Sequence, residues 1–125
     1  MANVSIHHDV EHKDIANKLA VLLMDWKSGG KHPIIFGNEG RWEEHPGLCA
    51  SFVYKVHIKL PHETPWDKKL PIAARKSNSY LVYTRHWLDA DNYQIISIMS
   101  PNAHELARTS FLSVLADRAE SFQNS

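Results

Sequence analysis

Two stretches of the chain carry apolar residues at the spacing of a helix. From Ile15 to Trp26 apolar side chains recur every three or four positions, and polar and glycine residues at 28–30 end the pattern, which predicts a helix over residues 10–28. Near the C-terminus, Asn102 is followed three positions later by Glu105, a combination typical of a helix start. The apolar stripe that continues from there predicts a second helix over residues 103–122.

Three segments between these helices have the character of strands. Residues 51–60 alternate apolar and polar side chains, so one face of this strand is predicted to enter the core and the other to be polar and basic. Residues 80–87 are rich in β-branched and aromatic side chains, and residues 93–99 are apolar enough for a central strand buried on both faces. The short turn between the last two segments predicts an antiparallel hairpin.

The remaining segments complete the predicted architecture. Val4 and Ile6 alternate with polar residues and indicate a short first strand within residues 3–7. Residues 29–50 are rich in glycine and predict an irregular connection without a regular element. Together the elements predict one domain over residues 1–125 of the α+β class, in which helices flank a small antiparallel sheet.

The charge of the chain is balanced overall but unevenly distributed. Its 14 basic and 14 acidic side chains give a formal net charge of zero. Between residues 55 and 85, however, only Glu63 and Asp67 oppose seven cations, a pattern that suits an anionic partner at one surface, although a solvated face would show the same pattern. The cations are Lys55, Lys59, Lys68, Lys69, Arg75, Lys76 and Arg85.

Composition argues against several other classes of protein. No apolar run approaches the roughly 20 residues needed to span a bilayer, and no charged segment precedes a cleavable apolar stretch, so we expect a cytoplasmic protein without a membrane partner. The single Cys49 excludes an internal disulfide. There is no glycine-rich phosphate-binding motif, and His8 and His12 have the spacing of helical zinc ligands but lack a third ligand. We therefore expect neither a small-molecule cofactor nor a metal.

The strand over residues 51–60 carries a first candidate for chemistry. The period of two places His57 and Lys59 on one face about 7 Å apart, with Lys55 one step further along. A histidine transfers protons near neutral pH and a lysine stabilises a developing phosphorane, the pairing that RNA cleavage through the 2′-hydroxyl requires. The alternative is the exposed face of an edge strand, where lysines discourage pairing with another chain.

His104 and Arg108 form a second candidate, one helical turn apart on one face. At the start of a long helix, free N–H groups and the positive end of the dipole attract anions and disfavour the imidazolium form of His104. Both pairs lie at edges of the same small sheet, so a joint site is a reasonable expectation. A surface histidine beside a solvated arginine is the alternative.

An ordered set of short segments gives the chain a more specific resemblance. The segments are WKSGG at 26–30, PIIFG at 33–37, VHIKL at 56–60, LVY at 81–83, residues 95–98 leading to Pro101, and HELAR at 104–108. In order and spacing they resemble the YafO family of bacterial toxins over residues 12–122. The strands and hairpin also resemble the wider RelE-like toxins, which implies the same α+β fold.

The resemblance implies a toxin of a type II toxin–antitoxin module. Toxins of this family are described as ribosome-dependent mRNA interferases, so the implied activity is a metal-independent endoribonuclease that cleaves translated mRNA by 2′-hydroxyl attack and inhibits translation. The implied partners are a cognate antitoxin, the ribosome and mRNA. Zero net charge predicts weak binding to naked RNA and therefore fits presentation of the message by the ribosome. We expect the antitoxin to carry an acidic segment that covers the basic middle of the chain.

Site residues are carried over position by position. Lys59 matches a catalytic lysine of the RelE pattern, and His57 stands where that pattern has a second lysine. Tyr80 replaces a phosphate-contacting arginine, so Arg75, Lys76 or Arg85 would have to substitute for it. His104 and Arg108 are the nearest candidates for the catalytic group after the last strand. The predicted catalytic residues are thus His57, Lys59, His104 and Arg108, and the predicted RNA-binding residues are Lys55, Arg75, Lys76, Tyr83 and Arg85.

Two other functions are consistent with the same fold. A non-catalytic, ParE-like toxin would act by binding a target such as gyrase and would have no need of proton carriers on the His57 and Lys59 face. A chain that has lost its activity would persist only as a binding partner of its antitoxin.

Overall fold

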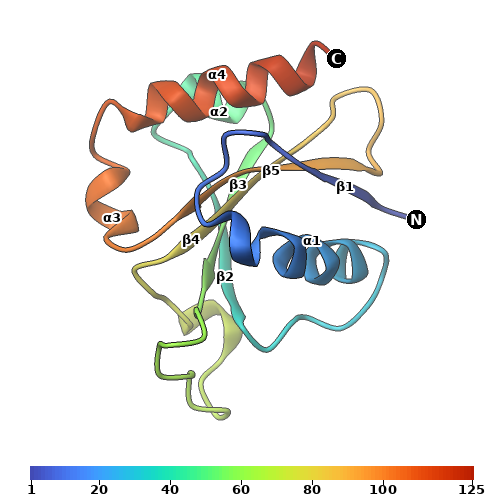
Figure 1. Ribbon diagram of the computed structural model, residues 1–125. Coiled ribbons are helices and arrows are strands. Elements are labelled where there is room, and N and C mark those ends of the chain that lie inside the picture. Colours follow the sequence, from blue (N-terminus) through green and yellow to red (C-terminus); the bar gives the residue numbers. More distant parts are fainter.

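A five-stranded sheet separates two helical layers (Figure 1). A computed structural model describes the whole chain, residues 1–125. The strands are β1 (Asn3–Ile6), β2 (Phe36–Arg41), β3 (Val53–Ile58), β4 (Tyr80–Arg85) and β5 (Asn92–Met99). The helices are α1 (Lys13–Lys27), α2 (Pro46–Ala50), α3 (Ala103–Leu106) and α4 (Phe111–Gln123), with a short 3₁₀ turn, η1, at Ile72–Ala74. No helix has the length and apolar character needed to cross a membrane.

The sheet has the order β1-β5-β4-β3-β2. Strands β2 to β5 pair antiparallel, which confirms the predicted hairpin and the α+β class. The first strand is the exception, because β1 runs parallel to β5 with Val4 opposite Tyr93. Nearly 90 residues separate these two strands, so no tight turn obliges them to run in opposite directions.

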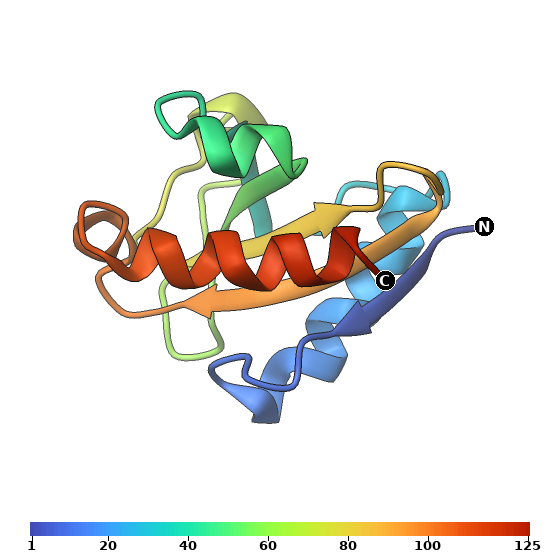
Figure 2. The ribbon, with the colours of Figure 1, turned by 90° about the horizontal axis from the view of Figure 1, so that it is seen from above.

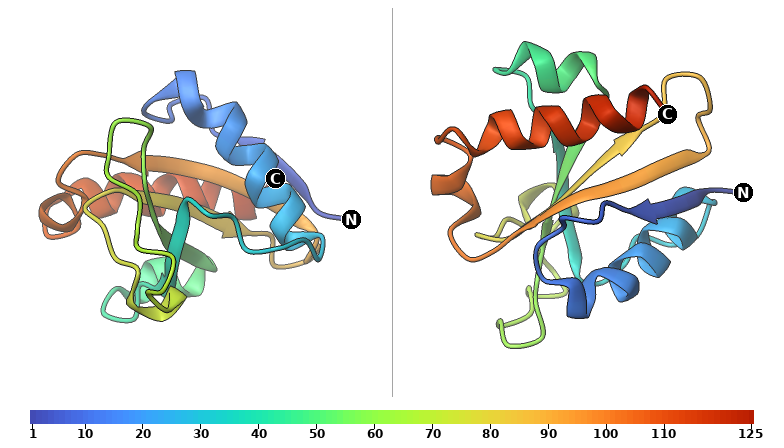
Figure 3. Two further views of the ribbon diagram at one scale, coloured as in Figure 1. Left: turned by 90° about the horizontal axis from the view of Figure 1, so that it is seen from below. Right: turned by 45° about the horizontal axis from the view of Figure 1, so that its top comes forward.

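Each face of the sheet has its own apolar core. The helix α1 covers one face, where Leu19 and Leu23 pack with Phe36, Val56 and Ile58. The helices α2 and α4 cover the other face, as seen from above in Figure 2 and with α1 on the opposite side in the right panel of Figure 3. The second core includes these side chains: Trp42, Leu48, Val53, Val82, Ile96, Leu115 and Ala119.

The second core corrects the prediction of a polar second face for β3. Val53 is 1% exposed, while Lys55 and His57 on the same face are partly buried. The face is therefore apolar where α2 and α4 cover it and polar only towards the end of β3. That polar end is where the candidate site lies.

The connection over residues 29–50 contains two regular elements that the pattern did not predict. The edge strand β2 is held by pairing with β3, with Gly40 opposite Lys55 and a bulge between Phe36 and Glu39. Gly37 has a packing role in this strand, since a Cβ there would lie 2.3 Å from the carbonyl oxygen of Arg75. In α2, the His45 side chain caps the helix by accepting a hydrogen bond from the Leu48 N–H at 3.2 Å.

The predicted helix over residues 103–122 is interrupted. It divides into α3 and α4 around Thr109, whose side chain competes with helical hydrogen bonding. The Thr109 hydroxyl donates to the Leu106 carbonyl at 2.7 Å and accepts from the Phe111 N–H at 3.2 Å. The predicted helix start at residue 103 is confirmed, but the helix that begins there has only four residues, so its macrodipole offers little attraction for an anion at His104.

Candidate functional site

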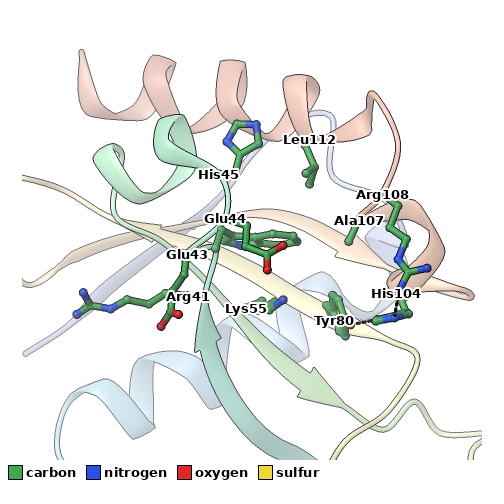
Figure 4. A pocket seen from close by; sticks show the side chains of 11 residues that line it. Arg41, Glu43, Glu44, His45, Lys55, Tyr80, His104, Ala107, Arg108 and Leu112 are labelled. Carbon is green, nitrogen blue, oxygen red and sulfur yellow. Dashed lines mark hydrogen bonds between the residues drawn. The ribbon is translucent and has the colours of Figure 1, made fainter.

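A pocket of about 460 Å³ opens on the sheet face that carries α2 and α4 (Figure 4). Lys55 of β3 and Tyr80 of β4 lie in its middle, with His104 and Arg108 on one side and the chain between β2 and α2 on the other (Figure 4). The full lining is Arg41, Trp42, Glu43, Glu44, His45, Lys55, Tyr80, His104, Ala107, Arg108 and Leu112.

Strand pairing and a few backbone contacts bring the two sides of the pocket together. Tyr80 at the start of β4 pairs with Met99 at the end of β5, so the chain that leaves β5 passes close to Tyr80. Asn78 then fixes α3 by two hydrogen bonds, accepting from the Ala103 N–H at 3.0 Å and, through Oδ1, from the His104 N–H at 3.1 Å. His104 is held beside Tyr80 as a consequence.

Lys55 is the central cation of the pocket. Its Nζ lies 4.5 Å from the ring centroid of Trp42 and 5.4 Å from that of Tyr80. Burial lowers the pKa of Lys55, and the negative charge of Glu44 partly opposes this effect. Two aromatic rings and a nearby carboxylate thus hold a partly desolvated ammonium, whose attraction for a phosphate is stronger than in bulk water.

His104 and Arg108 form a hydrogen-bonded pair with Tyr80. The His104 Nε2 accepts from the Arg108 guanidinium at 3.2 Å, and its Nδ1 lies 3.5 Å from the Tyr80 hydroxyl (Figure 4). Because a guanidinium can only donate, Nε2 carries no proton in this arrangement and the neutral ring has its proton on Nδ1. Burial and the charge of Glu105 raise the pKa of Tyr80, so its hydroxyl stays protonated.

His57 lies beside Tyr80 on the neighbouring strand and is not part of the pocket lining. The two residues are directly paired across β3 and β4, and their rings meet edge to face with centroids 4.9 Å apart. Its Nδ1 lies 2.8 Å from the Ser77 nitrogen and 2.9 Å from the Ser77 oxygen, so the neutral ring can accept from the first and the protonated ring can donate to the second.

The environment of His57 favours its neutral form. Burial is the main cause of its lowered pKa, and the charges of Lys55, Lys76 and His104 act in the same direction, while the hydrogen bond to the Ser77 backbone opposes them. Lys59, the next residue on the same face of the strand in the sequence, is not among these charges.

Lys59 is separated from the other three predicted catalytic residues. It follows the end of β3, and its Nζ lies 5.2 Å from the ring centroid of Trp66. It lines a different pocket, between α1 and the loop after β3. The structure therefore brings Lys55, rather than Lys59, together with His104 and Arg108.

Tyr83 is a core residue, which corrects its prediction as an RNA contact. It is 1% exposed, and its hydroxyl donates a hydrogen bond to Glu39. Lys27 also reaches Glu39, with 3.3 Å between Nζ and Oε1. Tyr83 thus offers no surface to a ligand and instead joins β4 to β2.

The other predicted RNA-binding cations are spread over the surface. The guanidinium of Arg75 donates to the carbonyl oxygens of Leu70 at 2.9 Å and Lys68 at 3.3 Å, and so braces its own loop. Lys76 is exposed beside Ser77, on the His57 side of the site. Arg85 is at the opposite end of β4 from Tyr80.

A group of potential metal ligands lies elsewhere, at the N-terminal turn. The ligand atoms of His7, His8 and Asp9 are within 4.8 Å of one another. His12 is not part of this group, because its Nε2 is hydrogen bonded to the Ser100 carbonyl at 2.7 Å. The Asp9 N–H donates to Nδ1 of His7 at 3.0 Å, so this nitrogen of His7 already has a hydrogen-bond partner.

Sequence reasoning missed the wall of the pocket that precedes α2. Arg41, Glu43, Glu44 and His45 come from the segment predicted to be irregular. The acidic pair was visible in the sequence, but only the pairing of β2 with β3 brings it opposite Lys55.

Comparisons with known proteins give one match. A family model described as "Toxin YafO, type II toxin-antitoxin system" matches residues 24–124, which include every residue that lines the pocket. No curated protein and no solved structure matches the chain.

Proposed function

Because the chain belongs to the YafO toxin family of type II toxin–antitoxin systems, we propose that it is an endoribonuclease that cleaves translated mRNA on the ribosome. One observation carries the proposal: the pocket places Lys55 near a hydrogen-bonded His104 and Arg108 pair, with the Tyr80 hydroxyl between them. Cations and proton carriers of this kind suit the cleavage of a phosphodiester without a metal.

We propose that Lys55 and Arg108 stabilise the negative charge of the reacting phosphate. Attack of the 2′-oxygen forms a bond to phosphorus while the bond to the 5′-oxygen breaks, and negative charge grows on the non-bridging oxygens. Lys55 offers a point charge from the sheet, and Arg108 offers a planar donor from the opposite wall. The carboxylates of Glu43 and Glu44 discourage an anion on the remaining side, so the phosphate is directed towards His104.

Proton transfer is assigned to His104, which lines the pocket directly. One group must accept the proton of the 2′-hydroxyl and another must donate a proton to the leaving 5′-oxygen. In its neutral form, His104 has an unprotonated Nε2 that can accept once a phosphate draws Arg108 away. The Tyr80 hydroxyl, protonated and 3.5 Å from Nδ1, is the nearest second proton carrier.

We propose two roles for His57 that experiment can separate. As a positioning residue, it would hold the Tyr80 ring by its edge-to-face contact. As the general base, the role favoured by its lowered pKa, it would need RNA to reach past Tyr80. Replacing His57 by Phe keeps an aromatic ring and removes the proton carrier, so retained cleavage would identify the positioning role.

Dependence on the ribosome follows from the weak electrostatics of the chain. A formal net charge of zero provides little attraction for free RNA, and two carboxylates line the pocket itself. The ribosome would supply the local concentration of substrate that the toxin's own charge does not.

The deciding experiment is primer extension on a reporter mRNA, with purified toxin, in the presence and absence of translating ribosomes. We expect cleavage only with translation, and a 2′,3′-cyclic phosphate at the new 3′ end. Efficient cutting of naked mRNA would refute ribosome dependence. If expression of the chain in cells arrested DNA replication without mRNA cleavage or loss of protein synthesis, the result would instead favour a non-catalytic, gyrase-binding toxin.

A further inference from the structure

A second concave site lies on the opposite side of the sheet from the pocket, between α1 and the loop that follows β3. This groove has a volume of about 240 Å³ and shares no residue with the pocket. Its lining is mainly apolar and includes Ile34, Ile35 and Trp66 together with Lys18, Lys59 and Glu63.

The groove has an exposed apolar edge. Ile34 is 83% exposed, more than any other large apolar side chain except Met1. The neighbouring backbone is fixed, because the Lys59 N–H donates to the Ile35 carbonyl at 3.0 Å. An apolar surface of this kind, on a preformed backbone, can accept a partner's side chain at a small entropic cost.

Two lysines and one carboxylate line the groove, so its formal charge is positive. Lys18 and Lys59 take part in none of the salt bridges of the chain. Glu63 lines the same groove but forms no salt bridge with either lysine, and its Oε1 instead accepts from the Leu60 N–H at 2.8 Å and lies 3.3 Å from the Ser79 hydroxyl. A partner that combines an apolar side chain with acidic neighbours would match both features.

From these observations we infer that the groove is a docking site for a segment of the cognate antitoxin, one that places an apolar side chain against Ile34 and acidic residues near Lys18 and Lys59. The inference rests on membership of a toxin–antitoxin family, which implies such a partner, and not on the proposed nuclease chemistry. The antitoxin would thus bind on the α1 side of the sheet, with or without further contacts over the pocket.

The groove is less suited to RNA. A nucleobase needs donors or acceptors for its edge, but the one aromatic side chain here already uses its polar atom, since Trp66 Nε1 donates to the Lys76 carbonyl at 3.0 Å. Apart from Lys18, Lys59 and Glu63, the remaining walls are aliphatic or proline side chains, which suit an apolar residue of a peptide.

The test measures binding of the purified antitoxin to the full chain by calorimetry. Ile34→Asp places a negative charge at the apolar edge, and Val21→Asp makes the same change at a 59% exposed position of α1 outside the groove. We expect Ile34→Asp to raise the dissociation constant by about 10-fold or more and Val21→Asp to change it less than about two-fold. Melting temperatures of both variants establish that they are folded.

A charge reversal gives an independent measurement. Lys18→Glu should weaken antitoxin binding and reduce its dependence on salt, because one favourable charge pair is lost and a repulsive one gained. Wild-type affinity in both Ile34→Asp and Lys18→Glu would overturn the inference.

Two further outcomes would also overturn it. If Ile34→Asp leaves antitoxin binding intact but converts a dimer of the free chain to a monomer, the groove is occupied by a second copy. If it leaves antitoxin binding intact but weakens binding to a single-stranded RNA oligonucleotide, the groove is part of the RNA path. None of these measurements requires the chain to cleave RNA, so the inference and the proposed function can fail separately.

Discussion

Replacing Lys55 by Met tests whether the pocket is the centre of catalysis. Methionine keeps an unbranched stem of similar length but removes the ammonium that lies 4.5 Å from the Trp42 ring centroid and 5.4 Å from that of Tyr80. The side chain is only partly buried, so the methionine end can occupy the same space between the rings.

The effect on stability should be small because two contributions oppose each other. Loss of the cation–π contacts costs about 0.5–1 kcal/mol each at a partly exposed site. The ammonium, however, is disfavoured by burial, which lowers its pKa, and the apolar replacement is relieved of that penalty. We expect a net change within about 1 kcal/mol, or roughly 4 °C in melting temperature for a chain of this size.

The effect on cleavage should be large. Removal of one preorganised group that stabilises transition-state charge costs about 10²–10³-fold in rate, equivalent to about 2.7–4 kcal/mol. Lys55→Arg keeps the positive charge and should recover part of the lost rate.

The assay is single-turnover cleavage of a reporter mRNA in a reconstituted translation system, followed by primer extension. Lys59→Met is the matched control. It also removes a lysine that lies over a tryptophan ring, but this lysine, Lys59, contacts Trp66 in the other pocket. The assignment would be refuted if Lys55→Met cleaved at the wild-type rate while Lys59→Met cleaved slowly. A fall of more than about 10 °C in the melting temperature of Lys55→Met would instead show a structural role.

Three other predictions follow from the same geometry. Arg108→Ala should slow cleavage by about 10²-fold or more, whereas Arg85→Ala, at the far end of β4, should cleave normally in the same assay. Tyr83→Phe removes the hydrogen bond to Glu39 and should lower the free energy of unfolding in urea by about 1–3 kcal/mol without slowing cleavage; a slower rate in a fully folded variant would restore an RNA role to Tyr83. Burial lowers the pKa of His57 below its ordinary 6.5. As the pH falls below about 6.5, the unfolded chain therefore binds more protons than the folded chain, so the urea midpoint should fall with acidification. His57→Gln should weaken that dependence, and an unchanged slope would contradict the assigned environment.

The sequence was sufficient for the elements whose pattern is set by burial on one face. The period of α1 and the alternation that brings Val56 and Ile58 of β3 to one side are direct consequences of a helix and a strand that present apolar residues to the same core. The segment 29–50 lacked such a signal, because the edge strand β2 is held by backbone hydrogen bonds to β3 and its Gly37 packs against the backbone of Arg75. Backbone pairing leaves little trace in the order of side chains.

In the candidate site, too, some features could be predicted from the sequence and others depended on the tertiary structure. Local spacing was enough to pair His104 with Arg108, since both are four residues apart on one turn of chain and do meet at 3.2 Å. The alternation in β3 also placed Lys55 and His57 on a common face. It could not show that Lys59 lies beyond the end of the strand and turns towards α1, because the position of a strand's last paired residue depends on its neighbours.

Residue types and their spacing thus determined the fold class, the two helical faces and the set of cations and histidines available for chemistry. The tertiary structure decided which of them act together. Tyr83 and Tyr80 carry the same functional group on one strand, but Tyr83 faces the α1 core, where its hydroxyl bonds Glu39, while Tyr80 lines the pocket beside His104. The physical reason is that a two-residue period assigns side chains to faces, whereas only the packing of helices and loops on each face determines where that face stays open to a ligand.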